Sequence, residues 1–418
     1  MRARAGQSDS SGIMAPLMDA ASSASTRRRV WAGRALQFAF NGATGFIVPF
    51  LGLFYKQAGL SGIEIGFLVS LGAVVSLLGA PLWGTLADRT GRPIRALQVA
   101  LAGAGFSALF LGRQSTMLGL GIGTAAFTGC VAGAWPLVDL ISLAQVRGTK
   151  VGFGAVRLGG SLGWTAVVVP AGLWLERTSL WSGFLGGAVA YFLTALLASR
   201  FLEPVREASI DNPGTGFFGT LRKSPPLMLM AAALLIFGVG FTGPKQFMAI
   251  YIADLGGSEI LVGLVSGLGA FFEWPFMLLA DRLSAQSRPS RVMRRGLLIF
   301  AFGWLAAAVI PSAAWYIPAR IIVSASYSFY IVGLVSTVSR RLTMAESGTG
   351  IAFFTVTLPA VADLLGGPVS GWSYDLAGGR AVHVVAAILG ALSWLVMRRL
   401  PPADASPHTS SLQSVRTA

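Results

Sequence analysis

Six ionisable residues interrupt apolar stretches of the chain that are otherwise long enough to cross a lipid bilayer. A charge at membrane depth costs about 2.5–3.5 kcal/mol on insertion scales, so such residues are usually retained for a function. Equal numbers of acids and bases indicate pairing across a polar cavity, where a carboxylate could carry a proton and a cation could bind a solute. The acids are Asp139, Glu273 and Asp363, and the bases are Arg157, Lys245 and Arg320.

The spacing of Asp139 and Arg157 indicates that these two charges face each other. Each lies nine residues from Gly148, in the turn at residues 147–149 that joins two apolar stretches. Antiparallel helices would place both at the same depth, roughly 13 Å from the turn at 1.5 Å per residue. A purely structural salt bridge between the two helices is the alternative to a binding role.

Glu273 is the first candidate for a proton site. It lies in the run Phe271-Phe272-Glu273-Trp274-Pro275, about two helical turns from the cytoplasmic end of its predicted span. A dehydrated cavity moves the pKa of a carboxyl toward neutrality, as a proton carrier requires. The rival is a structural pair with Lys245, which follows Pro244, where a broken helix could line the cavity. Lys245 could tune Glu273 or bind an anionic group.

The other ionisable residues have less distinctive contexts. Asp363 lies in the middle of a predicted span and could be a second proton carrier, or a lock to Arg320 or Lys245. Arg320 lies about one turn from the outer end of its span, so we expect its side chain to snorkel to the interface. His383 and His408 lie near an outer loop and in the C-terminal tail, which argues against a histidine proton relay.

Composition identifies the elements that must position these residues as membrane helices. The chain of 418 residues is 54% hydrophobic and 12% charged, with a mean hydropathy of +0.68, whereas soluble domains carry roughly 25% charged residues. Apolar runs long enough for a ~30 Å hydrocarbon core recur along it. We predict an all-α membrane protein with twelve spans, at residues 31–55, 62–86, 94–111, 117–144, 151–175, 180–201, 227–252, 260–280, 293–310, 315–338, 351–372 and 382–396.

The two halves of the chain share a pattern, which predicts two pseudo-symmetric six-helix bundles. Residues 59–66 and 256–263 are similar and each precede a span; those two spans end in the similar stretches 81–89 and 275–282. Related halves of this kind are typical of secondary transporters, whose substrate site lies between them near the bilayer midplane. The predicted organisation is an N-terminal tail (1–29), an N-terminal bundle (30–201), a cytoplasmic linker (202–224), a C-terminal bundle (225–400) and a C-terminal tail (401–418).

The positive charges set the predicted orientation. Most of the 32 Lys and Arg fall in segments on the side of the two termini, and the opposite segments hold only Lys56, Arg113, Arg177 and Arg380. This asymmetry follows the positive-inside rule and places both termini in the cytoplasm. The net charge of +15 therefore gives no reason to expect nucleic acid as a partner, because a soluble basic domain is lacking. The single cysteine, Cys130, is expected to be inert packing.

A cytoplasmic motif suggests a family. The run Gly84-Thr85-Leu86-Ala87-Asp88-Arg89-Thr90-Gly91-Arg92 resembles the signature between spans 2 and 3 of the major facilitator superfamily. Gly84 would permit close contact with a neighbouring helix and Gly91 would supply the tight turn. Topological charge alone accounts for Arg89 and Arg92, but not for an acid between glycines.

We expect the motif to act as a conformational latch. The Asp88 carboxylate would lie at the cytoplasmic N-terminus of span 11, where Ser347, Gly348 and Thr349 open the helix and its dipole attracts an anion. This contact would exist only while the cytoplasmic side is closed. The second copy, Asp281-Arg282, lacks the following glycine and is degenerate.

Three further runs resemble the lactose permease and phenylpropionate permease branch of that superfamily. They are residues 152–164, residues 135–139 and the aromatic-Asn-Gly pattern of Phe38, Asn41 and Gly42. The resemblance implies that Arg157 forks onto substrate oxygens, Asp139 accepts substrate hydroxyls and Trp164 stacks on a ring, with Phe38 and Asn41 lining the cavity. It also implies an acid before proline at Glu273. The chain departs from the branch at Phe153 and Gly159, which puts the shape of the pocket in doubt.

The resemblance implies a secondary active transporter. It would move a small organic solute (a sugar, a nucleoside or an aromatic acid) by alternating access and proton symport, as a monomer in a bacterial inner membrane. The alternative is a proton-coupled efflux antiporter, but Pro170-Ala171-Gly172 matches the glycine- and proline-rich span 5 signature of such proteins only weakly. The sequence shows no metal-ligand set, nucleophile elbow or phosphate loop, so we expect no enzymatic activity and no cofactor.

Overall fold

Helices form nearly all of the regular structure, because a bilayer leaves backbone groups no partner except each other. The computed structural model describes residues 11–147, 149, 151–202 and 216–401. The outer part of each predicted tail, residues 1–10 and 402–418, and most of the predicted linker, residues 203–215, lie outside these ranges.

The first bundle follows the predicted spans closely. Its helices are α1 (Ser11–Gly45), which continues through η1 (Val48–Phe50) into α2 (Leu51–Gln57), then α3 (Gly62–Thr90), α4 (Pro93–Leu111), α5 (Met117–Val146), α6 (Phe153–Arg177) and α7 (Leu180–Phe201). The main difference is at the start, where α1 extends into the predicted N-terminal tail.

The second bundle shows two departures from the prediction. A short helix, α8, occupies the end of the predicted linker, and the predicted span 11 is built from three consecutive pieces. The elements are α8 (Gly216–Lys223), α9 (Pro225–Asp254), α10 (Glu259–Gln286), α11 (Pro289–Ala308), η2 (Ala313–Trp315), α12 (Tyr316–Arg341), α13 (Met344–Ala352), the π-helical turn η3 (Phe353–Thr357) and α14 (Leu358–Arg398).

The predicted count of twelve spans is confirmed. Ten helical segments of the described chain are long and apolar enough to cross a membrane. The last of them, Glu346–Arg398, contains non-helical backbone at Ala377 and Gly378, so it holds two spans. The twelfth is α11, whose first turns are rich in arginine and which packs against α12 and α14.

Local sequence explains where the helices begin and end. The Ser61 hydroxyl and the Glu64 carboxylate form a capping box at the start of α3. The same helix ends at Gly91, whose φ of 60° is readily adopted only by glycine, so the predicted tight turn is present. Thr116 caps α5 by accepting a hydrogen bond from the Gly119 amide.

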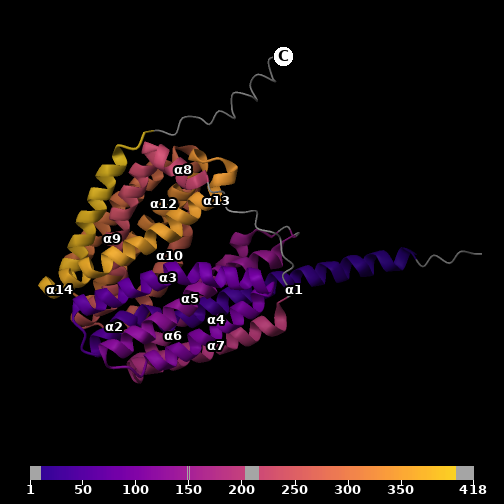
Figure 1. Cartoon of the computed structure of the whole chain (residues 1–418), viewed down its shortest axis with the longest axis horizontal. Helices are drawn as coiled ribbons and strands as arrows, with labels where there is room; N and C mark the ends of the chain where they lie inside the picture. Colours follow the sequence, from indigo (N-terminus) through magenta and orange to yellow (C-terminus); the bar gives the residue numbers. More distant parts are fainter. Residues whose placement is uncertain (1–10, 148, 150, 203–215, 402–418) are drawn as a thin grey trace, which may run out of the picture.

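Each bundle has its own packed centre, and the two centres extend toward each other at one end. Figure 1 shows the bundles meeting near α2 and the foot of α14, and diverging toward α8 and α13. Buried side chains of the first bundle gather around Leu97 and Tyr191, and those of the second around Phe237, Leu297 and Val323. The divergence positions the inner faces of both bundles around a central space.

The bundles touch through bare backbone where they meet. α3 crosses α14 at Gly66 and Gly367, and a Cβ on either residue would collide with the other's carbonyl oxygen. α6 crosses α10 in the same way, with Gly172 against the Glu259 carbonyl and Gly263 against the Val168 carbonyl. These contacts involve the starts of α3 and α10, the end of α6 and the part of α14 that precedes its break at Ala377 and Gly378, so this closed end lies opposite the chain termini.

Hydrogen bonds reinforce the crossing of α3 and α14. The Asp375 carboxylate accepts from the Gly62 amide at 2.6 Å and the Ile63 amide at 2.8 Å, which caps the N-terminus of α3 from the other bundle. Two turns deeper, the Ser70 hydroxyl donates to the Leu364 carbonyl at 2.7 Å. Helix-terminus contacts and glycine packing therefore hold the closed end together with apolar side chains of both bundles, such as Leu53 and Phe247.

A bulky side chain at this crossing should open the closed end. In a Cys130→Ser background carrying Ser70→Cys as reporter, Gly66→Leu is expected to raise the maleimide labelling rate severalfold, because Ser70 is buried in the crossing. Gly219→Leu is the control, since a Cβ at Gly219 would meet no atom within 4 Å. Unchanged labelling in Gly66→Leu would contradict the assigned role of the glycine crossing.

Candidate functional site

A cavity of about 450 Å³ lies between the two bundles. Residues from α1, η1, α5 and α6 line it on one side, and residues from α9, α10, α11 and α12 line it on the other. Both bundles therefore contribute to one site, as the sequence pattern predicts. The charged side chains in the lining are Lys245, Glu273 and Arg320.

Aromatic rings form much of the cavity wall. Trp135 and Trp164 come from the first bundle, and Phe241, Trp304 and Tyr327 come from the second. The rings of Phe241 and Tyr327 are nearly parallel, 6.2 Å apart and inclined by 15°. Of these five, sequence reasoning selected only Trp164. An aromatic residue among several serines of one predicted span could have indicated a cavity-lining position. Tyr327 on α12 has this context.

Asp139 and Arg157 lie at the same depth, and the structure brings them together. An Arg157 guanidinium nitrogen lies 4.0 Å from an Asp139 carboxylate oxygen, and 63% of the Arg157 side chain is exposed. The tighter partner of Asp139 is Gln37 on α1, which donates a hydrogen bond of 2.8 Å. Gln37 is nearly fully buried, and sequence reasoning missed it. Gln37 fixes the acid, and both Asp139 and Arg157 lie outside the lining of the cavity.

Lys245 and Asp363 form the second pair. Of the two partners considered for Asp363, Arg320 and Lys245, the structure shows Lys245. The Lys245 ammonium lies 2.7 Å from the Asp363 carboxylate, whose other oxygen accepts a 2.8 Å hydrogen bond from Thr242. Lys245 follows Pro244, which lies within a continuous α9, and both residues line the cavity. Asp363 is held outside the lining, behind Lys245.

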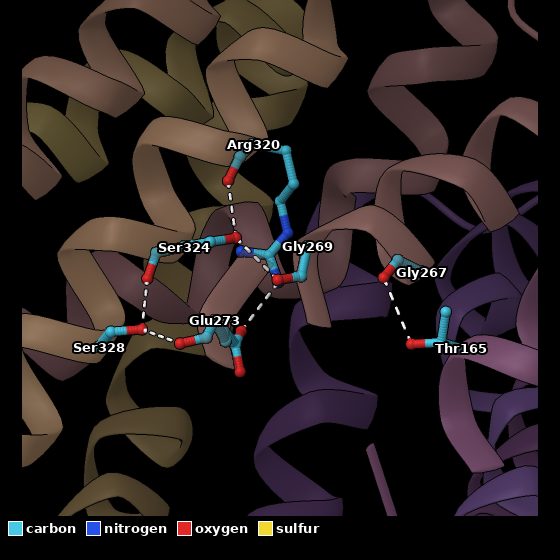
Figure 2. A network of polar contacts seen from close by, with 7 residues as sticks. All are labelled: Thr165, Gly267, Gly269, Glu273, Arg320, Ser324 and Ser328. Carbon is cyan, nitrogen blue, oxygen red and sulfur yellow. Dashed lines mark hydrogen bonds and ion pairs between the residues drawn. The ribbon is translucent and has the colours of Figure 1, made fainter. Parts of the chain in front are cut away.

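Glu273 and Arg320 form the third pair, which corrects two expectations. Figure 2 shows the Arg320 guanidinium reaching down α12 to the Glu273 carboxylate on α10, with 3.5 Å between the charged atoms. The expected snorkelling of Arg320 is wrong, because only 19% of its side chain is exposed and it points into the cavity wall. The rival pairing of Glu273 with Lys245 is also wrong, because each has a different partner.

The two predicted cavity residues of α1 differ in placement. Asn41 lines the cavity and donates to the Gln37 carbonyl at 2.9 Å, which connects it to the Asp139 support. Phe38 lies outside the cavity lining; its side chain is 42% exposed, and its backbone packs against Gly163 of α6. Trp164, one residue further along α6, lies in the lining.

The motif at the end of α3 lies apart from the other bundle. Asp88, Arg89 and Arg92 are exposed, and within the described residues the Asp88 carboxylate makes no hydrogen bond or ion pair. A Cβ at Gly84 would meet no atom within 4 Å, so Gly84 makes no close helix contact in this conformation. Gly91 makes the turn described above. The end that carries this motif is open.

The expected start of span 11 is also corrected. The helix does not open at Ser347–Thr349 but begins at Met344, since Thr343 and Glu346 form a capping box there. The Glu346 carboxylate also accepts a hydrogen bond from Thr220 of α8. An acid of this bundle therefore already occupies the helix N-terminus that Asp88 was expected to approach.

His383 lies five residues past the break at Gly378, as expected near the outer connection, and it lies in a packed interior. It is fully buried, and its Nε2 lies 2.7 Å from the Tyr316 hydroxyl. Its Nδ1 lies 2.7 Å from the Gly379 carbonyl, and the rings of Tyr251 and Trp304 pack around it. The carbonyl requires a proton on Nδ1, so Nε2 accepts from Tyr316 and the neutral ring is fully satisfied. His408 lies outside the described residues.

Two six-helix bundles that share a charged, aromatic-lined cavity, closed at one end and open at the other, define a secondary transporter. The protein is an integral membrane protein of this class. The model of the MFS_1 like family matches residues 30–385, so the chain belongs to that family of the major facilitator superfamily.

Named relatives and solved structures are consistent with this assignment. The maltose permease of Geobacillus stearothermophilus is 27% identical over 81% of this chain and 84% of the relative. The multidrug resistance protein MdtG of Yersinia enterocolitica is 26% identical over 55% of this chain and 58% of the relative. The nucleoside transporter NupG superposes with a TM-score of 0.79 at 14% identity, covering 89% of this chain and 98% of that one, which shows a shared fold.

Removal of one charge of the Lys245–Asp363 pair should destabilise the fold more than removal of both charges. Lys245→Met leaves the Asp363 carboxylate without a cation. The double variant Lys245→Met/Asp363→Asn carries no charge at either position. We expect the single variant to lose roughly 1–2 kcal/mol, less than the 3–5 kcal/mol of a fully buried pair, because solvent reaches Lys245. Thermal unfolding in detergent, followed by tryptophan fluorescence, checks this. The control is Lys223→Met, at an exposed lysine; a double variant less stable than the single one would argue against the pairing.

Proposed function

We propose that this transporter is a proton symporter for a small organic solute: a sugar, a nucleoside or an aromatic acid. The observation that carries the proposal is the Glu273–Arg320 pair in the wall of the cavity between the bundles. A carboxylate in this position can exchange its cationic partner for a proton when the cavity changes its access. Asp363, paired with Lys245 just behind the lining, is the second candidate for proton coupling.

The cavity chemistry supports the proposed solutes. Trp164 offers a flat face to a ring, and Asn41 offers an amide to hydroxyl groups. Arg157 and Asp139 lie outside the present lining; the exposed Arg157 side chain would reach in to fork onto substrate oxygens, and Asp139 would accept hydroxyls beside it. Lys245 adds a cation for an anionic group, and Phe38 would join the site only after a rearrangement. The maltose permease relative favours a sugar.

The proposed cycle moves the bundles 30–201 and 225–400 about the linker 202–224. With both termini in the cytoplasm of a bacterial plasma membrane, the open end of this structure faces the cytoplasm. The latch formed by Gly84, Asp88, Arg89, Gly91 and Arg92 would engage when that end closes. The protein would act as a monomer, with protons as the coupling ion and with no enzymatic reaction or cofactor.

A proton-coupled efflux antiporter for drugs or metabolites is the second candidate. The observation in its favour is the similarity to MdtG, although that match spans only 58% of the relative. The aromatic lining would also suit an apolar cation. Expulsion of a membrane-permeant drug, without uptake of any hydrophilic solute, would favour this candidate over symport.

Removal of the Glu273 charge should uncouple transport. In proteoliposomes given maltose, uridine or phenylpropionate, entry of the transported solute is expected to alkalinise the external buffer, and Glu273→Gln is expected to abolish this pH change. Glu259→Gln is the matched control, since it removes an acid from the first turn of the same helix. Coupled uptake that persists in Glu273→Gln would rule out Glu273 as the proton site.

Removal of the Asp88 charge should weaken closure of the cytoplasmic end. A carboxylate at a free helix N-terminus is worth about 0.3–1 kcal/mol and Glu346 already caps this one, so Asp88→Asn should shift the open-to-closed ratio at most about fivefold toward open. Spin labels at the exposed positions Arg95 and Arg340, in a Cys130→Ser background, report the distance between the bundles. Asp88→Glu keeps the charge and serves as the control; identical distance distributions for all three proteins would exclude the latch.

A further inference from the structure

The Arg320 guanidinium lies flat on a stretch of α10 that has no side chain. A Cβ built on Gly269 would lie 2.5 Å from its Nε, 2.7 Å from its Cζ and 2.8 Å from its Nη2. No side chain fits there unless the guanidinium moves. The guanidinium thus passes over residue 269 to reach Glu273, one turn along α10, and a side chain at residue 269 would displace it.

Two hydroxyl groups hold α12 in the register that this contact needs. Ser324 donates to the Gly269 carbonyl at 2.9 Å, and Ser328 donates to the Glu273 carbonyl at 3.0 Å. The two serines are four residues apart, as are the two carbonyls, so the bonds form a ladder along one face of each helix (Figure 2). Both serines are fully buried, and each also lies within hydrogen-bond distance of the carbonyl four residues earlier in α12.

Burial of the two serines does not by itself require hydrogen bonds to the neighbouring helix. A buried serine can satisfy its hydroxyl by bonding to the carbonyl four residues earlier in its own helix, without touching a neighbour. Here both hydroxyls also reach α10 at the two residues that position the ion pair. The opposite face of α10 packs against the first bundle, where Gly267 accepts a 3.4 Å hydrogen bond from Thr165. The ladder and the inter-bundle contact therefore lie on different faces.

We propose that Gly269 and Ser324 are positioning residues for the Glu273–Arg320 pair. Together they set the distance between the two charges, and so the pH range over which Glu273 exchanges its proton. The inference rests on the proposed role of Glu273 as proton site.

Few other charged or titratable groups face Glu273. Tyr327 on α12 and Lys245 on α9 line the cavity with it, and Arg157 on α6 lies outside the lining and acts electrostatically on Tyr327. The element η1 carries no charge, and the arginines of α11 lie in its first two turns, beside the last turns of α10. Unlike these groups, Arg320 is in direct contact with the Glu273 carboxylate. Its position therefore has the largest effect on the proton exchange of Glu273.

An infrared pH titration of the purified protein tests the proposal without any substrate. The carboxyl band of Glu273 is assigned by its loss in Glu273→Gln. We expect Gly269→Ala to move the titration midpoint by about one pH unit or more, the scale of a lost ion-pair partner. The midpoint should coincide with that of Arg320→Gln, and the double variant should show no further shift. Gly154→Ala, where a Cβ meets no atom within 4 Å, should titrate as the wild type does.

Two results would overturn the proposal. One is a Gly269→Ala protein that titrates like the wild type. The other is a Gly269→Ala substitution that shifts the Glu273 midpoint equally in the wild type and in the Arg320→Gln background, which would mean that the glycine acts through general packing. Should Gly269→Ala fail to fold, Ser324→Ala takes its place, with a smaller shift expected and none in the Arg320→Gln background. A wild type with no Glu273 band would remove the proton site and the proposal with it.

The titration also separates this inference from the proposed function. A Glu273 band that behaves as expected, in a protein whose uptake moves no protons, would refute symport and leave the positioning roles intact. Proton-coupled uptake, together with a Gly269→Ala protein that titrates like the wild type, would support symport and refute the positioning roles.

Discussion

A charged side chain inside a bilayer needs an opposite charge beside it, because neither lipid nor apolar side chains can replace its water. All six ionisable residues at membrane depth meet this requirement, in the pairs Arg157–Asp139, Lys245–Asp363 and Arg320–Glu273. Each pair joins helices of one bundle: α5 with α6, α9 with α14, and α10 with α12. The bundles can therefore rock against each other without separating any of these pairs.

The contacts between the bundles are of a different kind. They include glycine crossings, single hydroxyl bonds and the Asp375 cap on α3, beside apolar packing of residues such as Leu53 and Phe247. Such contacts depend on close backbone approach, so they are lost within a short displacement. Helix α3 carries an acid-to-helix contact at its closed end through Asp375, and the unengaged Asp88 at its open end. In the proposed cycle the two ends exchange these states, and no charge pair has to bridge the two bundles.

The sequence predicted some partners of the candidate site and not others. Asp139 and Arg157 could be matched because they flank one short turn, and an antiparallel pair of helices fixes their relative depth. No comparable argument links Glu273 to Arg320, which lie on α10 and α12 and meet through the register of two helices that are not consecutive. The same holds for Gln37, which supports Asp139 from α1. Depth is a local property of the chain, whereas partner choice depends on rotation of each helix about its axis.

By itself the sequence determined the number of spans, their approximate limits, the two-bundle fold and the presence of paired charges at membrane depth. These features follow from hydrophobic length, from the repeat and from the cost of an unpaired charge in lipid. The tertiary structure alone decided that Arg320 turns inward onto Gly269, that aromatic rings of both bundles wall the cavity, and which end is closed. These depend on how non-neighbouring helices rotate and tilt against each other, and no local pattern of residues encodes that.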